Sequence, residues 1–100
     1  MLLYNETFGI DKEIEQDWLQ WMKETGVPKT MDTGLFVSWK IYKVLHDDGE
    51  GSVSYSVQYF AETIEHVNLF LDKYAPALME EHRIYFQNRH VTFRTLLEEA

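Results

Sequence analysis

The feature that most constrains the fold is a stretch in the middle of the chain where apolar and small polar residues alternate. Residues 52–59 read Ser-Val-Ser-Tyr-Ser-Val-Gln-Tyr, with every apolar or aromatic residue at an odd position. A period of two is typical of a β-strand that buries one face and exposes the other. The pattern therefore predicts a sheet that packs one of its faces against a second layer.

Three further strands are predicted from other apolar runs. They cover residues 2–9, 35–45 and 91–98, while the alternating segment itself extends from Ser52 to about Ala61. Glycines and acidic residues at 46–51 lie between the second and third strands and are typical of a hairpin turn. The chain should therefore contain four strands, the middle two joined as a hairpin.

Two helical regions separate these strands. The first should begin at Asp11 as its N-cap and stop at Gly26, because apolar residues recur at helical spacing between these two signals. The second should begin with Thr63 as its cap, break at Pro76 and continue as a short helix towards Tyr85.

The order strand, helix, strand, strand, helix, strand predicts an α+β fold of the ferredoxin-like βαββαβ type. Right-handed crossovers close this order into a four-stranded antiparallel sheet with both helices on one face. The length of 100 residues is that of one domain, so we expect a single ferredoxin-like domain over residues 1–100.

The two faces of the predicted sheet differ in composition. Glu6 interrupts the apolar row of the first strand and is expected near an edge of the sheet. The rows expected to meet the helices are Val53, Tyr55, Val57 and Tyr59, with Val91 and Phe93. The opposite face should carry Asn5, Thr7, Ser38, Lys40, Tyr42, Ser54, Ser56, Gln58 and Arg94, together with Leu3, Phe36, Phe60 and Leu96.

This mixed face is either exposed to solvent or covered by a second subunit. Large exposed apolar patches are uncommon on monomers, and two-fold dimers are the commonest assembly that covers them. We therefore expect a homodimer.

The charge of the chain limits its partners. Nine basic residues face seventeen acidic ones, for a net charge of −8, so neither nucleic acid nor an anionic membrane is expected as a partner. There is no cysteine to form a disulfide or bind a metal. The first residues lack the pattern of a signal peptide and no run of ~18 apolar residues occurs, so neither a signal peptide nor a membrane helix is expected. We expect a soluble, cytoplasmic protein.

Five segments spread over nearly the whole chain carry a resemblance to a known family. They are Tyr4-Asn5, Trp18-Leu19-Gln20-Trp21-Met22-Lys23, Val57-Gln58-Tyr59-Phe60-Ala61, Ala75-Pro76-Ala77-Leu78 and Phe93-Arg94-Thr95-Leu96. Together they resemble a bacterial family of about this length that is known only as a domain of unknown function and is placed in the superfamily of dimeric α/β barrels. The resemblance implies that two protomers face their sheets together and enclose a barrel-like space. Superfamily relatives include cofactor-independent monooxygenases, small-molecule isomerases and haem-degrading enzymes, but no catalytic residue carries over from a family without an assigned activity.

Asn5, Gln58 and Arg94 are the candidate ligand-binding residues. Each is predicted on a strand face that a partner sheet would cover. Two amides beside a guanidinium are suited to a carboxylate or enolate oxygen, because arginine presents a rigid fork of donors. The alternative is a hydrogen-bonded polar layer inside the dimer, or a solvated sheet face.

No metal site and no cofactor are expected from the sequence. The histidines at 46, 66, 82 and 90 include no pair with the i, i+4 spacing of a helical metal site. The resemblance leaves open that His66 binds haem, given an apolar pocket beside the second helix. Trp21 is expected in the core, because aromatic residues at helical spacing usually pack there.

Three functions are compatible with these features. The first is a homodimer that binds a small, partly apolar molecule between its facing sheets. The second is an enzyme of the cofactor-independent monooxygenase or isomerase kind. The third is a structural or regulatory interaction module, in which Leu3, Phe36, Phe60 and Leu96 fill the space between the sheets.

Overall fold

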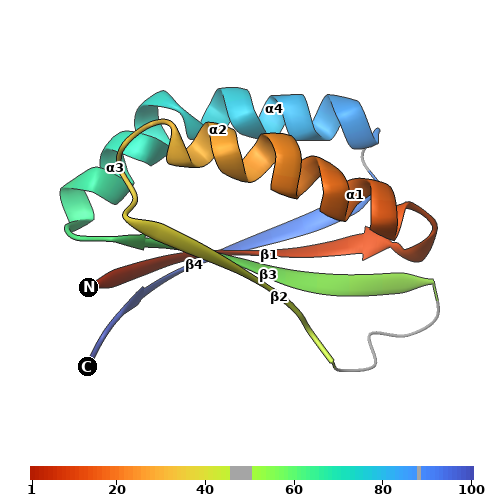
Figure 1. The fold of residues 1–100 in the computed structure, drawn as a ribbon, viewed down its shortest axis with the longest axis horizontal. Helices are drawn as coiled ribbons and strands as arrows, with labels where there is room; N and C mark the ends of the chain where they lie inside the picture. The colour runs from red at the N-terminus through yellow and green to blue at the C-terminus, as the bar shows by residue number, and fades with distance from the viewer. Residues whose placement is uncertain (46–50, 88) are drawn as a thin grey trace.

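The computed structural model describes residues 1–45, 51–87 and 89–100, so the predicted hairpin turn lies largely outside the described residues. A four-stranded antiparallel sheet in the order β2-β3-β1-β4 carries all of the helices on one face (Figure 1). This arrangement confirms the predicted α+β ferredoxin-like fold. The strands are β1 (Leu2–Asp11), β2 (Ser38–Lys43), β3 (Ser52–Ala61) and β4 (His90–Glu98).

Strand β1 lies in the interior of the sheet, between β3 and β4. Its residues Tyr4, Phe8 and Ile10 are buried beneath the helices. Glu6 belongs to the same row and pairs with Val57 on one side and Arg94 on the other. The expectation that Glu6 lies near an edge of the sheet is therefore wrong.

The row of β4 side chains that faces the helices is not the apolar row that the sequence predicts there, but the other one. Arg94 pairs with Glu6 and shares its face, and Leu96 lies on that same side. Val91 and Phe93 lie on the open face, where they are 60% and 66% exposed. The predicted facing of these four β4 residues is wrong, because the register with β1 places Arg94 and Leu96 opposite Glu6 and Tyr4 on the helix side of the sheet.

The first helical region passes through Gly26 without the predicted stop. Gly26 has a helical φ of −63°. A Cβ atom at this position would lie 2.8 Å from the Trp21 ring and 2.9 Å from Met22 Sδ. Gly26 is thus required for close packing within the helix and does not end it. The region comprises a 3-10 turn (Lys12–Ile14), α1 (Glu15–Trp21), a π-helical segment (Met22–Gly26) and α2 (Val27–Met31).

The second helical region confirms both of its predicted signals. Helix α3 (Ile64–Lys73) begins after Thr63, whose hydroxyl accepts a hydrogen bond from the backbone N–H of His66 at 3.3 Å. Helix α4 (Ala75–Phe86) follows the break, with Pro76 in its first turn, where no backbone N–H is needed. None of the helices in the described parts of the chain is long and apolar enough to cross a membrane.

Asp11 does not act as the predicted helix cap. No hydrogen bond runs from the first helical turn to its side chain. Its carboxylate instead accepts a hydrogen bond from Arg89 Nε at 2.7 Å, next to the start of β4. The acidic side chain therefore stabilises a contact between distant segments rather than the end of a helix.

Aromatic side chains form the core between the sheet and the helices. Trp18 is fully buried and packs on Phe8 and Tyr55, with ring centroids 5.2 Å and 5.1 Å away. Its Nε1–H donates to His82 Nε2 at 2.8 Å, which joins α1 to α4. Phe36, predicted on the open face, is also buried, because it precedes β2 and turns into this core.

We predict that Trp18→Ala lowers the free energy of unfolding by about 3–5 kcal/mol, because it opens a cavity in the core. Trp21→Ala, at a half-buried position of the same helix, is the matched comparison and should cost clearly less. Urea unfolding followed by circular dichroism measures both values. Equal losses would contradict the assignment of Trp18 as the central core residue.

Candidate functional site

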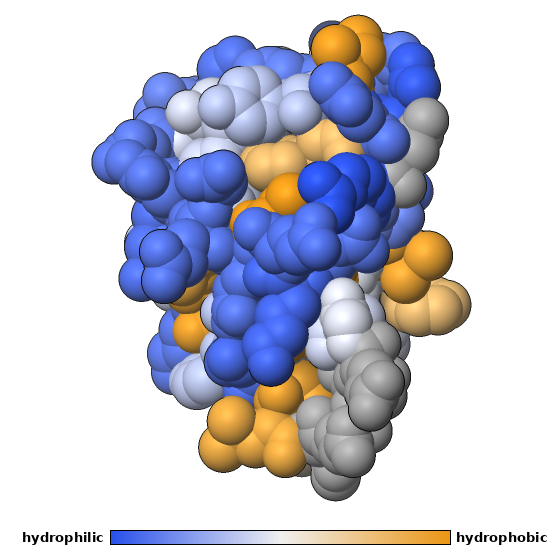
Figure 2. Space-filling view, turned by 90° about the vertical axis from the view of Figure 1, so that its right-hand side faces the viewer, coloured by the Kyte–Doolittle hydropathy of each residue, from blue (hydrophilic) through white to orange (hydrophobic). Residues whose placement is uncertain are grey.

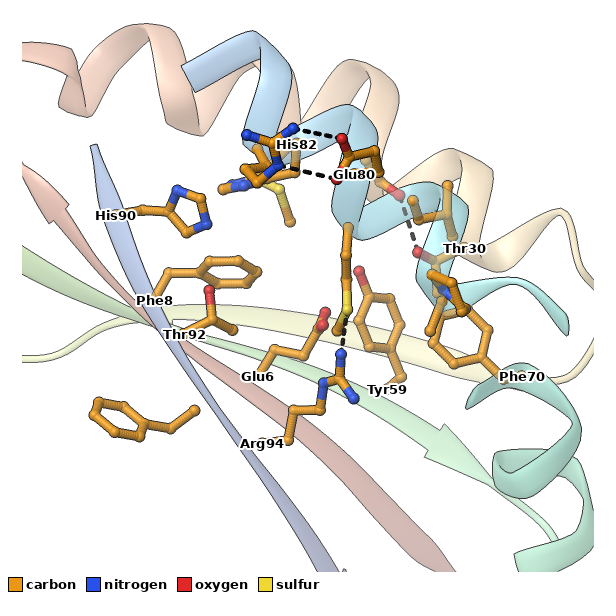
Figure 3. A pocket seen from close by; sticks show the side chains of 18 of the residues that line it. Glu6, Phe8, Thr30, Tyr59, Phe70, Glu80, His82, His90, Thr92 and Arg94 are labelled. Carbon is orange, nitrogen blue, oxygen red and sulfur yellow. Dashed lines mark hydrogen bonds and ion pairs between the residues drawn. The ribbon is translucent and has the colours of Figure 1, made fainter. Parts of the chain in front are cut away.

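A pocket of about 680 Å³ lies between the sheet and the helices. Strands β1, β3 and β4 form one side of it, and the helical segments form the other (Figure 3). The residues that line it include the aromatic residues Phe8, Trp21, Tyr59, Phe70 and, at its margin on β4, Phe93. Polar side chains in its lining include Glu6, Thr30, His82, His90, Thr92 and Arg94.

The structure separates the three residues that the sequence groups into one site. Asn5 and Gln58 are register partners on the open face, where Ser56 Oγ donates to Asn5 Oδ1 at 2.6 Å and Gln58 Nε2 donates to Ser56 Oγ at 3.2 Å. Arg94 lies on the other face and lines the pocket. The two amides therefore belong to a polar network on the open side of the sheet, and Arg94 belongs to the pocket.

Glu6 places a carboxyl group on the pocket wall among aromatic side chains. Burial raises the pKa of Glu6 to about 7, and it outweighs the hydrogen bond from Tyr4 and the charge of Arg94, which both act to lower it. The Tyr4 hydroxyl donates to Glu6 Oε2 at 3.2 Å. The carboxyl group can therefore gain or lose a proton near neutral pH, where a general acid or base is most effective.

Arg94 has an unusual partner for a guanidinium. It pairs with Glu6 in register, yet no ion pair joins the two within the described ranges. Its Nη2 contacts Sδ of Met79 on α4 instead. Because a thioether is a weak acceptor, the guanidinium has donors left for an oxygen atom of a bound molecule.

Tyr59 completes this polar end of the pocket. Figure 3 shows the side chains of Glu6, Tyr59 and Arg94 converging from three neighbouring strands. Burial, followed by the charge of Glu6, raises the pKa of the Tyr59 hydroxyl. The hydroxyl therefore keeps its proton at neutral pH and can donate a hydrogen bond.

A histidine pair forms a second polar region of the pocket. The rings of His82 and His90 lie 4.3 Å apart, nearly perpendicular to each other. Burial lowers the pKa of both, that of His82 to about 4, so both are neutral at pH 7. His82 Nε2 accepts the Trp18 hydrogen bond, whereas His90 Nδ1 is buried and has no hydrogen-bond partner among the described residues.

The described residues show no metal-binding cluster of three or more His, Cys, Asp or Glu side chains. His66, the possible haem ligand, is on α3 and is not among the residues that line the pocket. Trp21, which we predicted as a core residue, is half-buried and lines the pocket.

The comparison with known families covers the whole chain. Residues 1–100 match the model of a domain of unknown function, DUF4286. The chain belongs to the DUF4286 family. Membership confirms the resemblance seen in the sequence and brings no assigned activity with it. No curated protein matches this DUF4286 domain.

Several solved structures share the fold of this DUF4286 domain at low sequence identity, which shows the fold alone. HapK from Hahella chejuensis has a TM-score of 0.71 at 9% identity, over 100% of this chain and 93% of that one. An ethyl tert-butyl ether d family protein from Bacillus halodurans has a TM-score of 0.68 at 12% identity, over 100% of both chains. SnoaB from Streptomyces nogalater, a cofactor-independent oxygenase, has a TM-score of 0.61 at 8% identity, over 99% of this chain and 93% of that one.

Sequence reasoning did not identify Glu6, Tyr59, His82 or His90 as pocket residues. A signal was present at Glu6, because an acidic residue inside an apolar strand row must be either at a margin or in a special environment. No signal marked the histidine pair, since α4 and β4 bring the two rings together only in the folded chain.

We predict that Glu6→Gln becomes more stable than the wild type as the pH rises. A carboxyl group whose pKa is raised from 4.5 to about 7 contributes stability that is present below pH 4.5 and lost as the pH rises through 7. The difference in free energy of unfolding between variant and wild type should therefore grow by about 3 kcal/mol between pH 4 and pH 8.

The measurement is urea unfolding of both proteins at several pH values. Burial depresses the pKa of His82, which acts on stability in the opposite direction, but this contribution cancels in the difference. Glu62→Gln, at an exposed position after β3, is the matched control. A pH-independent difference for Glu6→Gln would contradict the raised pKa.

Proposed function

We propose that this domain binds a small, partly apolar molecule with an oxygen group in the pocket between the sheet and the helices. The observation that carries the proposal is the convergence of Glu6, Tyr59 and Arg94 in an otherwise largely apolar cavity of about 680 Å³. Apolar cavities of this size with a few converging polar groups are typical of small-molecule sites.

The contacts of Arg94 support a ligand oxygen at this end of the pocket. Its partner Met79 is a weak acceptor, and a carbonyl or enolate oxygen would accept a far stronger hydrogen bond from the same guanidinium. The aromatic lining would then cover the apolar part of the ligand. This location replaces the space between facing sheets as the leading ligand site, and a role for Asn5 and Gln58 in that space stays a prediction.

An enzyme of the cofactor-independent monooxygenase or isomerase kind is the second candidate. The specific observation in its favour is Glu6, a carboxyl group with a pKa of about 7 next to a guanidinium. Perturbed groups of this kind are enriched at catalytic sites. The fold shared with SnoaB is compatible with such chemistry and does not distinguish it from simple binding.

We also propose that two copies of the chain associate through the open faces of their sheets. Val91 and Phe93 on β4 are more than half exposed there, and Leu97 is 47% exposed. Figure 2, which faces one end of the molecule, shows hydrophobic residues at the edges of a mostly hydrophilic surface and recessed near its middle. An apolar row that turns away from the protomer's own helices is explained if a second sheet covers it.

Arg94→Met should weaken ligand binding about 10- to 100-fold and leave the unfolding midpoint nearly unchanged, because Arg94 is largely exposed and makes no ion pair in the described structure. Native mass spectrometry of freshly purified protein identifies a retained molecule. A thermal-shift panel of aromatic acids, phenols, quinones and bicyclic ketones then gives affinities.

Lys23→Met, which removes an exposed cation outside the pocket, is the control for the loss of charge. Equal effects of the two variants would contradict a specific role for Arg94. If neither the mass spectra nor the panel showed a ligand, the small-molecule function would be abandoned in favour of an interaction module.

For the dimer, we predict that the wild type has twice the mass of one protomer by light scattering and that Val91→Glu is monomeric. The introduced carboxylate would be buried without a partner in the interface. Ile84→Glu, a change of the same kind at a similarly exposed position on α4, should stay dimeric. A monomeric wild type at micromolar concentration would overturn the proposal.

A further inference from the structure

Glu6 and Arg94 lie opposite each other on neighbouring strands without forming an ion pair, which leaves both side chains able to contact a bound molecule. As antiparallel register partners, their Cβ atoms are about 5 Å apart on the same face of the sheet. Opposite charges at this position commonly pair, yet within the described residues Arg94 contacts Met79 and the carboxylate accepts its hydrogen bond from Tyr4. One Glu6 oxygen and several Arg94 donors are thus unused by the described protein groups.

These unused groups are complementary in function. A carboxylate oxygen can accept a proton, and an adjacent guanidinium can stabilise the negative charge that the lost proton leaves behind. Such a pair is suited to a neutral carbonyl compound that carries an acidic C–H bond next to its C=O group.

We propose that Glu6 and Arg94 form a proton-transfer site for a ketone that carries an acidic C–H bond next to its carbonyl group, an inference that rests on the proposed binding function. In the step, the C–H bond next to the carbonyl breaks and its proton forms an O–H bond on Glu6. The electron pair of that bond becomes the C=C bond of an enolate, and the carbonyl π pair moves to the oxygen. Arg94 donates hydrogen bonds to this oxygen.

Return of the proton completes the reaction without any oxidant or reductant. Delivery to the original carbon gives exchange with solvent hydrogen, and delivery to a conjugated carbon further along the ligand gives a 1,3-proton shift. Both routes regenerate the Glu6 carboxylate. The class of activity is therefore enolisation or double-bond isomerisation of a ketone.

The pocket extends along β4 beyond Arg94, past Thr92 to His90. His90 lies four residues from Arg94 on the same face of β4, which corresponds to about 13 Å along the strand. A ligand with its carbonyl at Arg94 would extend past Phe8 and Thr92 towards His90. At that far end, the buried Nδ1 of His90 has no hydrogen-bond partner among the described residues.

The test uses 2-tetralone, a bicyclic ketone, with the intact wild-type chain in D₂O. Proton NMR measures the loss of the signal of the protons next to the carbonyl, and ligand line broadening measures binding separately. The wild type should bind and accelerate exchange. Glu6→Gln should still bind but lose at least about 100-fold in exchange rate, and Glu6→Asp should retain part of it.

The pH dependence of the exchange rate distinguishes a base from a structural residue, because a purely structural role of Glu6 would not change it. The exchange rate should rise with pH and level off above about 7, because the carboxylate is the active form and burial raises its pKa to about 7. The charged or titratable groups that line the pocket around Glu6, or contact it, are Tyr4 on β1, Tyr59 on β3, His90 and Arg94 on β4, and Glu80, His82 and Arg83 on α4.

The outcomes separate this inference from the proposed function. Binding of 2-tetralone without exchange, or exchange that is unchanged in Glu6→Gln, would overturn the proton-transfer site and leave the binding function intact. A profile that levels off below the ordinary histidine pKa of about 6.5, with activity lost in His90→Gln, would assign the base to His90 and overturn the role of Glu6. No binding of 2-tetralone would overturn the ketone class, while the broader ligand panel decides the binding function.

Discussion

A buried hydrogen bond between two helices holds the upper wall of the pocket in place. Trp18 and His82 are 64 residues apart in the chain, and their contact at 2.8 Å ties α1 to α4 above the sheet. The bond requires a neutral imidazole, because Nε2 accepts a hydrogen bond from the indole N–H. Burial supplies this condition by lowering the pKa of His82 to about 4. His82 also lines the pocket, so the bond that stabilises the helical layer also fixes the ring that a ligand would meet.

The sheet divides the molecule into two functional sides. Glu6 and Arg94 face the helices, whereas Val91 and Phe93 face away from them. The alternation of side chains along β4 produces both surfaces from consecutive residues. Ligand binding and association of protomers would therefore use different rows of the same strand. Substitutions on the two rows with no shared partner should have nearly additive effects.

The parts of the fold that depend on local signals could be predicted from the sequence. The period-two alternation predicts the strands. Thr63 caps its own helix through a hydrogen bond within the first turn, and Pro76 fits the start of α4 because it lacks a backbone N–H. The continuation through Gly26 could not be predicted, because the glycine accommodates the Trp21 and Met22 side chains within the helix and does not end it, and no local pattern distinguishes these two roles. Local rules are reliable where neighbours in sequence determine the energy.

The candidate site was predictable only in part for the same reason. Arg94 was identified by its chemistry, but its face was wrong, because the apolar row of β4 is the outer one. Asn5 and Gln58 do lie together, but on the opposite side of the sheet from the pocket. The environment of Glu6 depends on groups from three strands and from α4, and no pattern along the chain expresses such a combination.

The net charge of −8 gives the position of Arg94 a kinetic consequence. The long-range electrostatic field of an acidic protein slows the approach of anions, even when the pocket they would enter is lined by a guanidinium such as that of Arg94. A molecule that arrives uncharged and becomes anionic only beside Arg94 does not experience that repulsion on the way in. Selection between ligands would thus begin during diffusion, before any contact is made. Salt shortens the reach of the field, so high ionic strength would admit carboxylates that the protein repels in dilute buffer.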